Sequence, residues 1–496
     1  MHLPTWFHHR KTDRVFLGTK GLFGLSAVSV PLAEYNTHLY IVGQSGSGKS
    51  KLLQHLLFEI ISNGWGCGVI DPHSDLINDL LAQLHESGWL AKPQNAKRIL
   101  LLDPSRSDLI VPVNLLKSSF ANSYELAENI VEAFRRVWPE TLSKAPRFAQ
   151  ILRNTLVVLA ENNLSLGELE PFLTQPSLRK NLLAHIADPE IVSFFTNQYN
   201  RWGREQVIMA GPVLNKVAAF LFQPPVRQSL SAATNRLDFR TIIDSGTILL
   251  ADLGGLNGET QQLYGSLLVT SLEQAAMSRR DQDVAERRPF FCMIDEFPFF
   301  CSRDASTLAR ILSEVRKFNC LLGLAHQTVA QTDQRMQGAL ENAKLKCVFA
   351  TGRDTANALA RQLLLPNPDL IKHEVVDDEA QERSHPLYET LMNQLEMGIQ
   401  RLMRLKKRHM LVKLPERDTL LLLRTPNAPT KRTHKTTLEQ VKSVLIRQAA
   451  QEISQPALTQ RQNADEGSTP PVVDQSSPAQ WKESLWHEPK TEENRA

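Results

Sequence analysis

The sequence predicts an α/β protein whose mostly parallel β-sheet is interrupted by an inserted all-helical domain. In residues 37–116, short apolar runs alternate with segments of helical periodicity, and the same alternation returns in residues 239–452. Apolar strands that alternate with helices are typical of a parallel sheet covered by helices on both faces. Between these blocks, residues 117–238 contain helical segments and no convincing strand. A chain of 496 residues has room for both units.

The elements of the two α/β blocks follow from apolar runs and amphipathic periods. Strands are expected at 38–43, 66–71, 98–103, 246–252, 289–295, 320–325, 346–350, 409–413 and 418–423. Helices are expected at 51–61, 259–279, 302–317, 353–363, 385–406 and 437–452. The resulting β/α alternation predicts one motor-like α/β unit made of two separated stretches of chain.

The insertion and the two ends of the chain have different characters. Helices at 123–137, 145–162, 176–187 and 188–200 are expected to fill the insertion. Residues 1–36 form an N-terminal extension, which lacks the apolar core of a signal peptide. Residues 453–496 are rich in Gln, Ser, Pro, Thr and acidic residues, so we expect a disordered tail.

Composition narrows the class of protein. Charged residues make up 22% and hydrophobic residues 42% of the chain, as in ordinary soluble proteins. No apolar run approaches the roughly 20 residues that a bilayer-spanning helix needs. The formal net charge is +3, and the acidic tail leaves the rest mildly basic, which favours anionic partners. The five cysteines form no C-x-x-C pair, so we expect buried reduced thiols and a cytoplasmic location.

A phosphate-binding loop of the form G-x-x-x-x-G-K-S follows the first predicted strand. Its residues are Gly43, Gln44, Ser45, Gly46, Ser47, Gly48, Lys49 and Ser50. The glycines let backbone N–H groups approach phosphates, Lys49 supplies positive charge, and the Ser50 hydroxyl can hold Mg²⁺. Because a strand precedes the loop and a helix follows it, the helix N-terminus faces the phosphates. We therefore expect a nucleoside triphosphate to bind here with Mg²⁺, and a chance Gly/Ser turn is disfavoured.

A second motif ends the predicted strand at 289–295. The apolar run from Phe290 to Ile294 is followed by Asp295 and Glu296, which is the pattern of a Walker B strand. Such strands present their carboxylates at the carboxyl edge of the sheet, where α/β proteins bind ligands. We expect Asp295 to position Mg²⁺ and Glu296 to polarise the attacking water. A strand that merely ends in solvated acids is the alternative.

Two further polar residues have candidate roles at the same reaction. Gln327 ends the strand at 320–325, where it could sense the γ-phosphate or simply cap the next turn. Arg316 and Lys317 lie at the end of the helix at 302–317, where cations favour the helix dipole. Alternatively, Arg316 reaches the phosphates of a neighbouring subunit as an arginine finger. Spacing alone leaves both roles of Arg316 open.

The order of these motifs resembles that of the HerA/FtsK superfamily of P-loop ATPases. The resemblance rests on the phosphate loop, Asp71-Pro72-His73-Ser74-Asp75-Leu76, the helical insertion, Ile294-Asp295-Glu296 and Ala325-His326-Gln327. It covers residues from about 35 to about 425 and is strongest to the conjugative coupling proteins of type IV secretion, the TraD/TraG type. Loop and Walker B are general to P-loop ATPases, whereas the remaining features are more specific together.

The resemblance implies a RecA-like motor domain that hydrolyses ATP with Mg²⁺ and pumps DNA through a ring, typically a homo-hexamer. It also implies an arginine that acts in trans upstream of the sensor glutamine, and Arg316 lies eleven residues before Gln327. Contact with DNA would involve the phosphate backbone and would not depend on base sequence. The insertion at 117–238 would face relaxosome components or other substrate proteins.

The N-terminus departs from this pattern, because coupling proteins usually carry N-terminal membrane helices. Only about 36 residues precede the first predicted strand here, and they contain no apolar span. We therefore expect either a motor that docks on a separate membrane-embedded partner, peripheral to the inner membrane, or a cytoplasmic DNA translocase.

The same motifs also occur in ATPases that do not move DNA. An ATPase that powers pilus assembly or protein export shares most of these motifs and is the main alternative. The L-S-G-G-Q signature of ABC-type ATPases is absent from the sequence, and Glu296 argues against a switch that does not hydrolyse nucleotide. A set of cations could touch DNA, although a solvated helical face explains them better: Arg401, Arg404, Lys406, Lys407 and Arg408.

Overall fold

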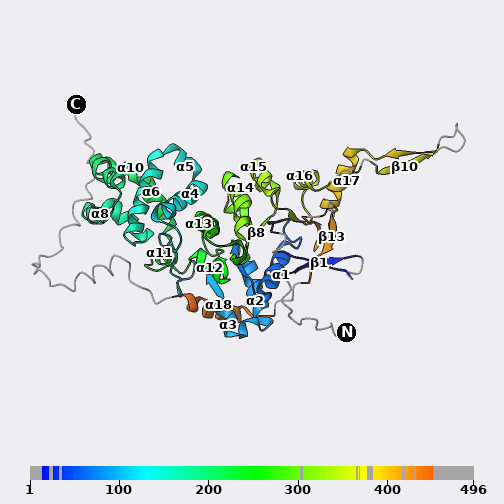
Figure 1. Cartoon of the computed structure of the whole chain (residues 1–496), viewed down its shortest axis with the longest axis horizontal. Helices are drawn as coiled ribbons and strands as arrows, with labels where there is room; N and C mark the ends of the chain where they lie inside the picture. The colour runs from blue at the N-terminus through cyan, green and yellow to red at the C-terminus, as the bar shows by residue number, and fades with distance from the viewer. Residues whose placement is uncertain are drawn as a thin grey trace, which may run out of the picture.

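The computed structural model describes residues 14–450 except for 22–25, 33–35, 302–304, 365–366, 368, 377–383, 416, 418 and 428–431. The expected disordered tail at 453–496 and residues 1–13 of the N-terminal extension lie outside the described residues. An 11-stranded sheet forms the centre of the molecule, and a helical unit lies at one end of it (Figure 1).

The strands follow one another across the sheet in an order that mixes distant parts of the chain. In this order they are β2 (Ser26–Val30), β1 (Val15–Lys20), β13 (Leu421–Arg424), β12 (His409–Lys413), β9 (Leu345–Val348), β3 (Leu39–Val42), β8 (Cys320–His326), β7 (Phe290–Ile294), β4 (Gly66–Asp71), β6 (Ile248–Asp252) and β5 (Ile99–Leu102). The strands from β9 to β5 are parallel, and β12, β13, β1 and β2 are antiparallel to their neighbours.

The parallel strands are buried along their whole length, because helices cover the sheet. The helices of this unit are α1 (Lys49–Ser62), α2 (Asp75–Glu86), α3 (Pro93–Ala96), α12 (Phe239–Ser245), α13 (Gly258–Ser278), α14 (Ala305–Glu314), α15 (Gln334–Leu340), α16 (Arg353–Leu363), α17 (Leu391–Met403) and α18 (Lys435–Ala449). The mostly parallel α/β sheet predicted from the sequence is therefore confirmed, with most strands within two residues of their expected bounds.

The predicted helical insertion lies between β5 and β6, and residues 117–238 contain no strand. Its helices are α4 (Ser123–Val137), α5 (Pro139–Lys144), α6 (Pro146–Glu161), α7 (Leu169–Thr174), α8 (Pro176–Leu183), α9 (Pro189–Ser193), α10 (Glu205–Phe220) and α11 (Pro224–Leu230). α4 starts at a capping box, in which the Glu125 N–H donates to Asn122 Oδ1 at 2.9 Å. α4 packs against α6 and α13, which joins the insertion to the motor unit.

Two regions differ from the sequence prediction. β1 and β2 pair with each other, and β1 adds to β13, so part of residues 1–36 extends the sheet. The helix expected at 385–406 begins only at Leu391, because Pro386 lies in a strand, β11 (Ser384–Tyr388), that pairs with β10 (Ile371–Val376). This hairpin projects from the molecule at the end opposite the insertion (Figure 1).

Two expectations from composition can be compared with the structure. All five cysteines are buried and free, as expected for reduced thiols. Within the described residues, no single helix has the length and apolar character that a membrane crossing requires. Helices α10 and α11 have that length and apolar composition only when they are taken together, and the angle between them is 108°.

Candidate active site

The phosphate loop connects β3 to α1, and its backbone requires glycine at two positions. Gly48 has a φ of 122°, and a Cβ there would lie 3.2 Å from Cα of Arg408 and 3.3 Å from a ring carbon of Phe349. A Cβ on Gly43 would lie 2.5 Å from Cβ of Phe349. Lys49 begins α1, so the helix N-terminus adjoins the loop, as the sequence predicts.

Two backbone segments that are distant in sequence form hydrogen bonds with the phosphate loop. The N–H of Gln44 donates to the carbonyl of Ala350 at 2.9 Å, and the N–H of Arg408 donates to the carbonyl of Ser47 at 2.7 Å. Arg408 has a φ of 68°, which is uncommon for a residue with a side chain. Its guanidinium donates to the carbonyl of Thr425 at 2.8 Å. Sequence reasoning missed this support because a backbone contact leaves no residue pattern.

The cations at 401–408 do not form one helical face, which corrects the interpretation favoured from the sequence. α17 ends at Met403, so Lys406, Lys407 and Arg408 lie beyond the helix. The left-handed backbone at Arg408 and its bond to Ser47 are incompatible with continued helical periodicity.

The structure brings the Walker B carboxylates against the lysine of the loop. Lys49 Nζ lies 2.7 Å from Glu296 Oε1 and 3.6 Å from Asp295 Oδ1. All three side chains are less than a tenth exposed, at 7%, 9% and 8%. Glu296 has a φ of 48°, a strained conformation for a residue other than glycine, and such strain is concentrated at functional sites.

Burial and charge act in opposite directions on these two carboxylates. Burial raises the pKa of Asp295, and the positive charge of Lys49 opposes this only in part. Burial also favours a higher pKa for Glu296, but the hydrogen bond and charge of Lys49, with help from Gln327 and Gln331, hold that pKa below its usual value. Glu296 is therefore ionised, as a general base that takes a proton from water must be.

A second glutamine, which the sequence analysis did not single out, contacts the same carboxylate. Gln331 Nε2 donates to Glu296 Oε2 at 3.2 Å. Its Oε1 accepts from the backbone N–H groups of Gln327 at 3.2 Å and Thr328 at 3.1 Å. Gln331 thus links the strand-end segment to Glu296. The pattern Thr328-x-x-Gln331, a capping box, was the signal that could have identified it.

The residue before Gln327 is anchored in the core. His326 Nε2 lies 2.7 Å from the hydroxyl oxygen of Tyr40, and its ring packs edge-on against Phe297 with centroids 5.1 Å apart. Burial lowers the pKa of His326 to about 4, so the imidazole is neutral at physiological pH. Tyr40 belongs to the strand before the phosphate loop and Phe297 follows Glu296, so His326 connects both motifs to Gln327.

The Asp71-Pro72-His73 motif forms part of the same edge of the sheet. The Asp71 carboxylate accepts from the N–H groups of His73 at 2.9 Å and Ile77 at 3.0 Å, which fixes the start of α2. Burial raises the pKa of Asp71 to about 6, and the neighbouring Asp252 and Asp295 add to this rise. The motif therefore positions the loop after β4 beside the Walker B carboxylates.

Arg316 lies at the opposite edge of the sheet, in the turn Val315–Phe318 that precedes β8. β8 has seven residues and rises about 20 Å, and its last residue, His326, aligns with Val42 just before the phosphate loop. An arginine side chain cannot span that distance, so Arg316 does not reach the phosphate loop of its own chain.

The loop residues fit a nucleoside triphosphate with Mg²⁺. Ser47 Oγ is buried and has no hydrogen-bond partner among the described residues, which leaves it available to a phosphate oxygen. Ser50 at the start of α1 is exposed. Within the described part of the chain, no cluster of three or more His, Cys, Asp or Glu side chains could hold a metal ion by itself. Mg²⁺ would therefore be held by Ser50, Asp295 and phosphate oxygens, and it would neutralise phosphate charge.

Comparisons with known proteins agree with this geometry. Residues 25–272 match the family model "Helicase HerA, central domain", whereas no sequence match was found among curated proteins. The fold is similar to that of the bacterial conjugative coupling protein TrwB lacking N-terminal residues, with 16% identity and a TM-score of 0.53, over 82% of this chain and 88% of that truncated chain.

Two further solved structures share the fold. TrwB in complex with ADP and Mg²⁺ has 15% identity and a TM-score of 0.51, over 84% of this chain and 91% of that chain. VirB4 of Thermoanaerobacter pseudethanolicus has 14% identity and a TM-score of 0.53, over 84% of this chain and 96% of VirB4. The fold is that of RecA-like P-loop motors, and the family match shows that the chain belongs to the HerA central-domain family.

Proposed function

We propose that this chain is an ATPase that moves DNA through a ring of its own copies, in the manner of a type IV coupling protein. The observation that carries the proposal is the buried contact of Lys49 with Glu296 and Asp295 at the carboxyl edge of a parallel sheet. A loop lysine beside a metal-binding and a water-activating carboxylate is the arrangement that phosphoryl transfer requires.

Each residue of the site has a distinct role in this proposal. Residues 43–50 enclose the phosphates, and Lys49 binds the β- and γ-phosphates. Ser50 and Asp295 hold Mg²⁺, and Glu296 orients and deprotonates the attacking water. Gln327 senses the γ-phosphate, and Arg316 completes the site of the neighbouring subunit in a homo-hexamer. The position of Arg316, about 20 Å from its own phosphate loop, favours action in trans.

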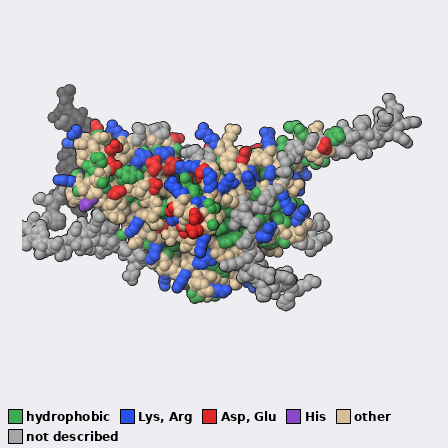
Figure 2. All heavy atoms as spheres, viewed as in Figure 1, with side chains coloured by type: hydrophobic (Ala, Val, Ile, Leu, Met, Phe, Trp, Pro, Cys, Tyr) green, Lys and Arg blue, Asp and Glu red, His purple; other side chains and the backbone are tan. Residues whose placement is uncertain are grey.

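DNA as the transported polymer has two lines of support. TrwB, whose fold is similar, carries the description of a conjugative coupling protein. On the face shown in Figure 2, many Lys and Arg side chains are spread over the motor unit, and such side chains can contact a phosphate backbone. We further propose that residues 117–238 form one domain that receives relaxosome components or another substrate protein.

The decisive experiment is the ATPase rate of the full chain with and without single- and double-stranded DNA across a salt series. Stimulation by DNA that fades as salt rises is expected, since each phosphate contact releases counterions. An ATPase rate that does not respond to either form of DNA would contradict DNA translocation.

A second candidate is an ATPase that powers pilus assembly or protein export. The placement of Arg408 favours it, because this cation supports the phosphate loop and is not available on a helical face for DNA. This candidate predicts ATP hydrolysis that is unaffected by DNA and stimulated by a membrane-embedded partner protein.

A further inference from the structure

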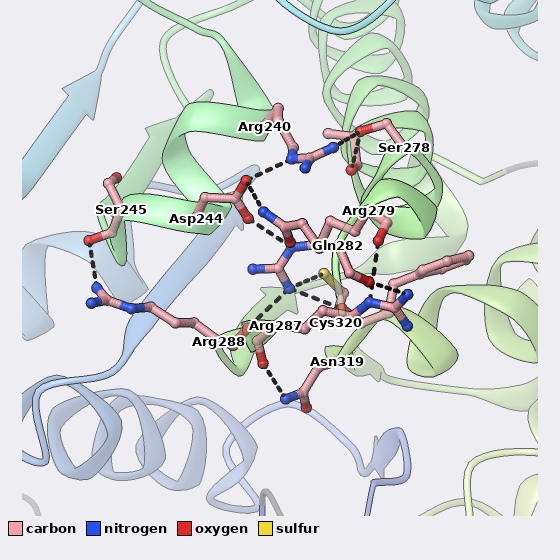
Figure 3. A network of polar contacts seen from close by, with 12 residues as sticks. Arg240, Asp244, Ser245, Ser278, Arg279, Gln282, Arg287, Arg288, Asn319 and Cys320 are labelled. Carbon is pink, nitrogen blue, oxygen red and sulfur yellow. Dashed lines mark hydrogen bonds and ion pairs between the residues drawn. The ribbon is translucent and has the colours of Figure 1, made fainter. Parts of the chain in front are cut away.

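Two arginine side chains form hydrogen bonds with the turn that carries Arg316. Arg279 and Arg287 belong to the connection between α13 and β7, and Figure 3 shows both side chains directed toward the segment that leads into β8. This connection is separate from the phosphate loop and from the Walker B carboxylates that follow β7.

Arg279 is fully buried, with 1% of the residue exposed. Its Nε donates to Asp244 Oδ1 at 2.8 Å, and its Nη1 donates to the carbonyls of Arg288 and Phe318, both at 2.9 Å. The Asp244 carboxylate is itself held by Arg240 at 2.6 Å and by Gln282 at 2.9 Å. A buried guanidinium that donates in several fixed directions orients its partners more strictly than a lysine would.

Arg287 holds the same turn one residue earlier. Its Nη1 donates to the carbonyl of Lys317 at 3.0 Å, and its guanidinium carbon lies 5.1 Å from the centroid of the Phe318 ring. Its Nε donates to the carbonyl of Arg279 at 3.2 Å, which joins the two arginines. Together they contact the carbonyls of both residues that follow Arg316.

The turn is closed from the other side by Asn319. This residue has a φ of 58°, its N–H donates to the carbonyl of Arg316 at 3.0 Å, and its side chain donates to the carbonyl of Arg287 at 2.7 Å. These contacts fix the backbone that follows Arg316. The side chain of Arg316 is half-buried, and among the described residues it forms no ion pair with an acidic side chain.

We propose that Arg279 and Arg287 are positioning residues that fix the turn of Arg316 for action at the neighbouring subunit's site. This inference rests on the proposed trans role of Arg316. A charge that stabilises a transition state must be held within a fraction of an ångström of its working position, so the residues that fix its backbone control its effect. Both side chains bond to backbone carbonyls of the protein, so their proposed effect on the reaction is exerted through Arg316.

The test uses full-length chains that carry one substitution each and are mixed in pairs. Arg287 is only half-buried, so Arg287→Ala is the main variant, and Arg279→Lys is the second. Arg287→Lys keeps the charge but loses the forked donor geometry. The matched control is Arg288→Ala, because Arg288 is exposed and, among the described residues, its side chain donates only to the carbonyl of Ser245, at 3.5 Å.

The expected result is a lower kcat for Arg287→Ala, about tenfold or more, with unchanged affinity for a fluorescent ATP analogue, since its own phosphate loop is intact. Arg287→Lys and Arg279→Lys fall between this variant and the wild type, and Arg288→Ala matches the wild type. Mixing Arg287→Ala with Lys49→Ala restores activity at about a quarter of the interfaces in randomly mixed rings. Mixing it with Arg316→Ala restores none, because both variants damage the same side of the interface.

Three outcomes separate failure of the inference from failure of the proposed function. If Arg316→Ala is rescued by Lys49→Ala but Arg287→Ala is not, the positioning role is wrong. If Arg287→Ala is rescued by Arg316→Ala, it acts on its own subunit's Walker B strand, which also overturns the inference. If Arg316→Ala is not rescued by Lys49→Ala, the trans role in the proposed function fails, and the inference fails with it.

Discussion

Lys49 Nζ donates to Glu296 Oε1 at 2.7 Å, so the lysine expected to bind phosphate and the carboxylate expected to activate water neutralise each other. Both groups are buried, and each would be costly to leave without a partner. The phosphates of ATP compete with Glu296 for Lys49. Binding of nucleotide would therefore release the Glu296 carboxylate for its contact with water.

Glu296→Gln should abolish turnover and retain ATP. The amide cannot accept a proton from water, so we expect kcat to fall by about a hundredfold or more. Affinity for ATP should rise, because Lys49 no longer has an ionised competitor. Single-turnover hydrolysis and equilibrium binding of a fluorescent ATP analogue measure the two effects. Lys49→Ala, the comparison variant, should lose binding as well, and wild-type turnover in Glu296→Gln would refute the role of Glu296.

Gln331→Ala should lower kcat with little change in nucleotide affinity. The substitution removes the hydrogen bond to Glu296 and the support of the Gln327 backbone, and a hydrogen bond to a charged group contributes about 1.5–3 kcal/mol. We expect a reduction of about tenfold or more in steady-state ATPase assays. Gln334→Ala is the control, because Gln334 is exposed on α15. Equal rates for both variants would show that Gln331 has no part in hydrolysis.

Arg408 gives a test of backbone support for the phosphate loop. Arg408→Gly removes the side chain but suits a φ of 68°, whereas Arg408→Val places a β-branched residue there. We expect Arg408→Val to unfold more readily in urea than Arg408→Gly, by about 1–2 kcal/mol. It should also bind ATP more weakly, because its N–H leaves the Ser47 carbonyl. Equal stability and affinity of the two variants would contradict this support.

His38 should make the fold sensitive to acid. Its Nε2 lies 3.0 Å from the carbonyl of Leu312, and its Nδ1 accepts from the N–H of Leu322 at 3.0 Å. Burial lowers its pKa to about 4, and the charge of Arg316 contributes. The unfolded chain, with the ordinary pKa of 6.5, binds the proton more tightly. Stability from this group is therefore complete above pH 6.5 and declines as pH falls toward 4.

The measurement compares the wild type with His38→Gln by urea unfolding at pH 7 and pH 5. The wild type should lose about 2 kcal/mol more than the variant over this interval, since one pKa unit corresponds to about 1.4 kcal/mol. The other buried histidines are common to both proteins, so the difference isolates His38. Parallel losses in both proteins would mean that His38 does not titrate in this range.

The sequence predicted those parts of the site that consist of residues adjacent in the chain, namely the phosphate loop and the Walker B segment. β3, β4 and β7 are apolar runs bounded by turn residues, so their bounds and the carboxylates after them follow from local pattern. The support of Ser47 by Arg408 depends on backbone atoms 361 positions apart, which no local pattern encodes. Gln331 was encoded by a capping-box pattern, but the pattern alone does not show that its side chain also reaches Glu296.

In the fold, too, the elements that sequence reasoning missed are those that depend on contacts between distant parts of the chain. β1 and β2 join the antiparallel edge of the sheet, where several of their residues are exposed and the apolar signal is weak. β10 and β11 pair with each other and not with the main sheet, so hydrophobic periodicity could not separate them from the helix that follows. Local chemistry thus predicted the catalytic edge, whereas the additions around it depend on tertiary pairing.

β8 begins just after the turn of Arg316 and ends just before Gln327, and its neighbours β3 and β7 bond to it on both sides. Because one continuous strand joins the two ends, a displacement at the glutamine end would carry the turn of Arg316 and the residues that hold it. In a ring where Arg316 serves the adjacent subunit, loss of the γ-phosphate at one interface would alter the readiness of the next. ATP hydrolysis would then proceed from one interface to the next in a single direction around the ring, and β8 alone would link successive sites.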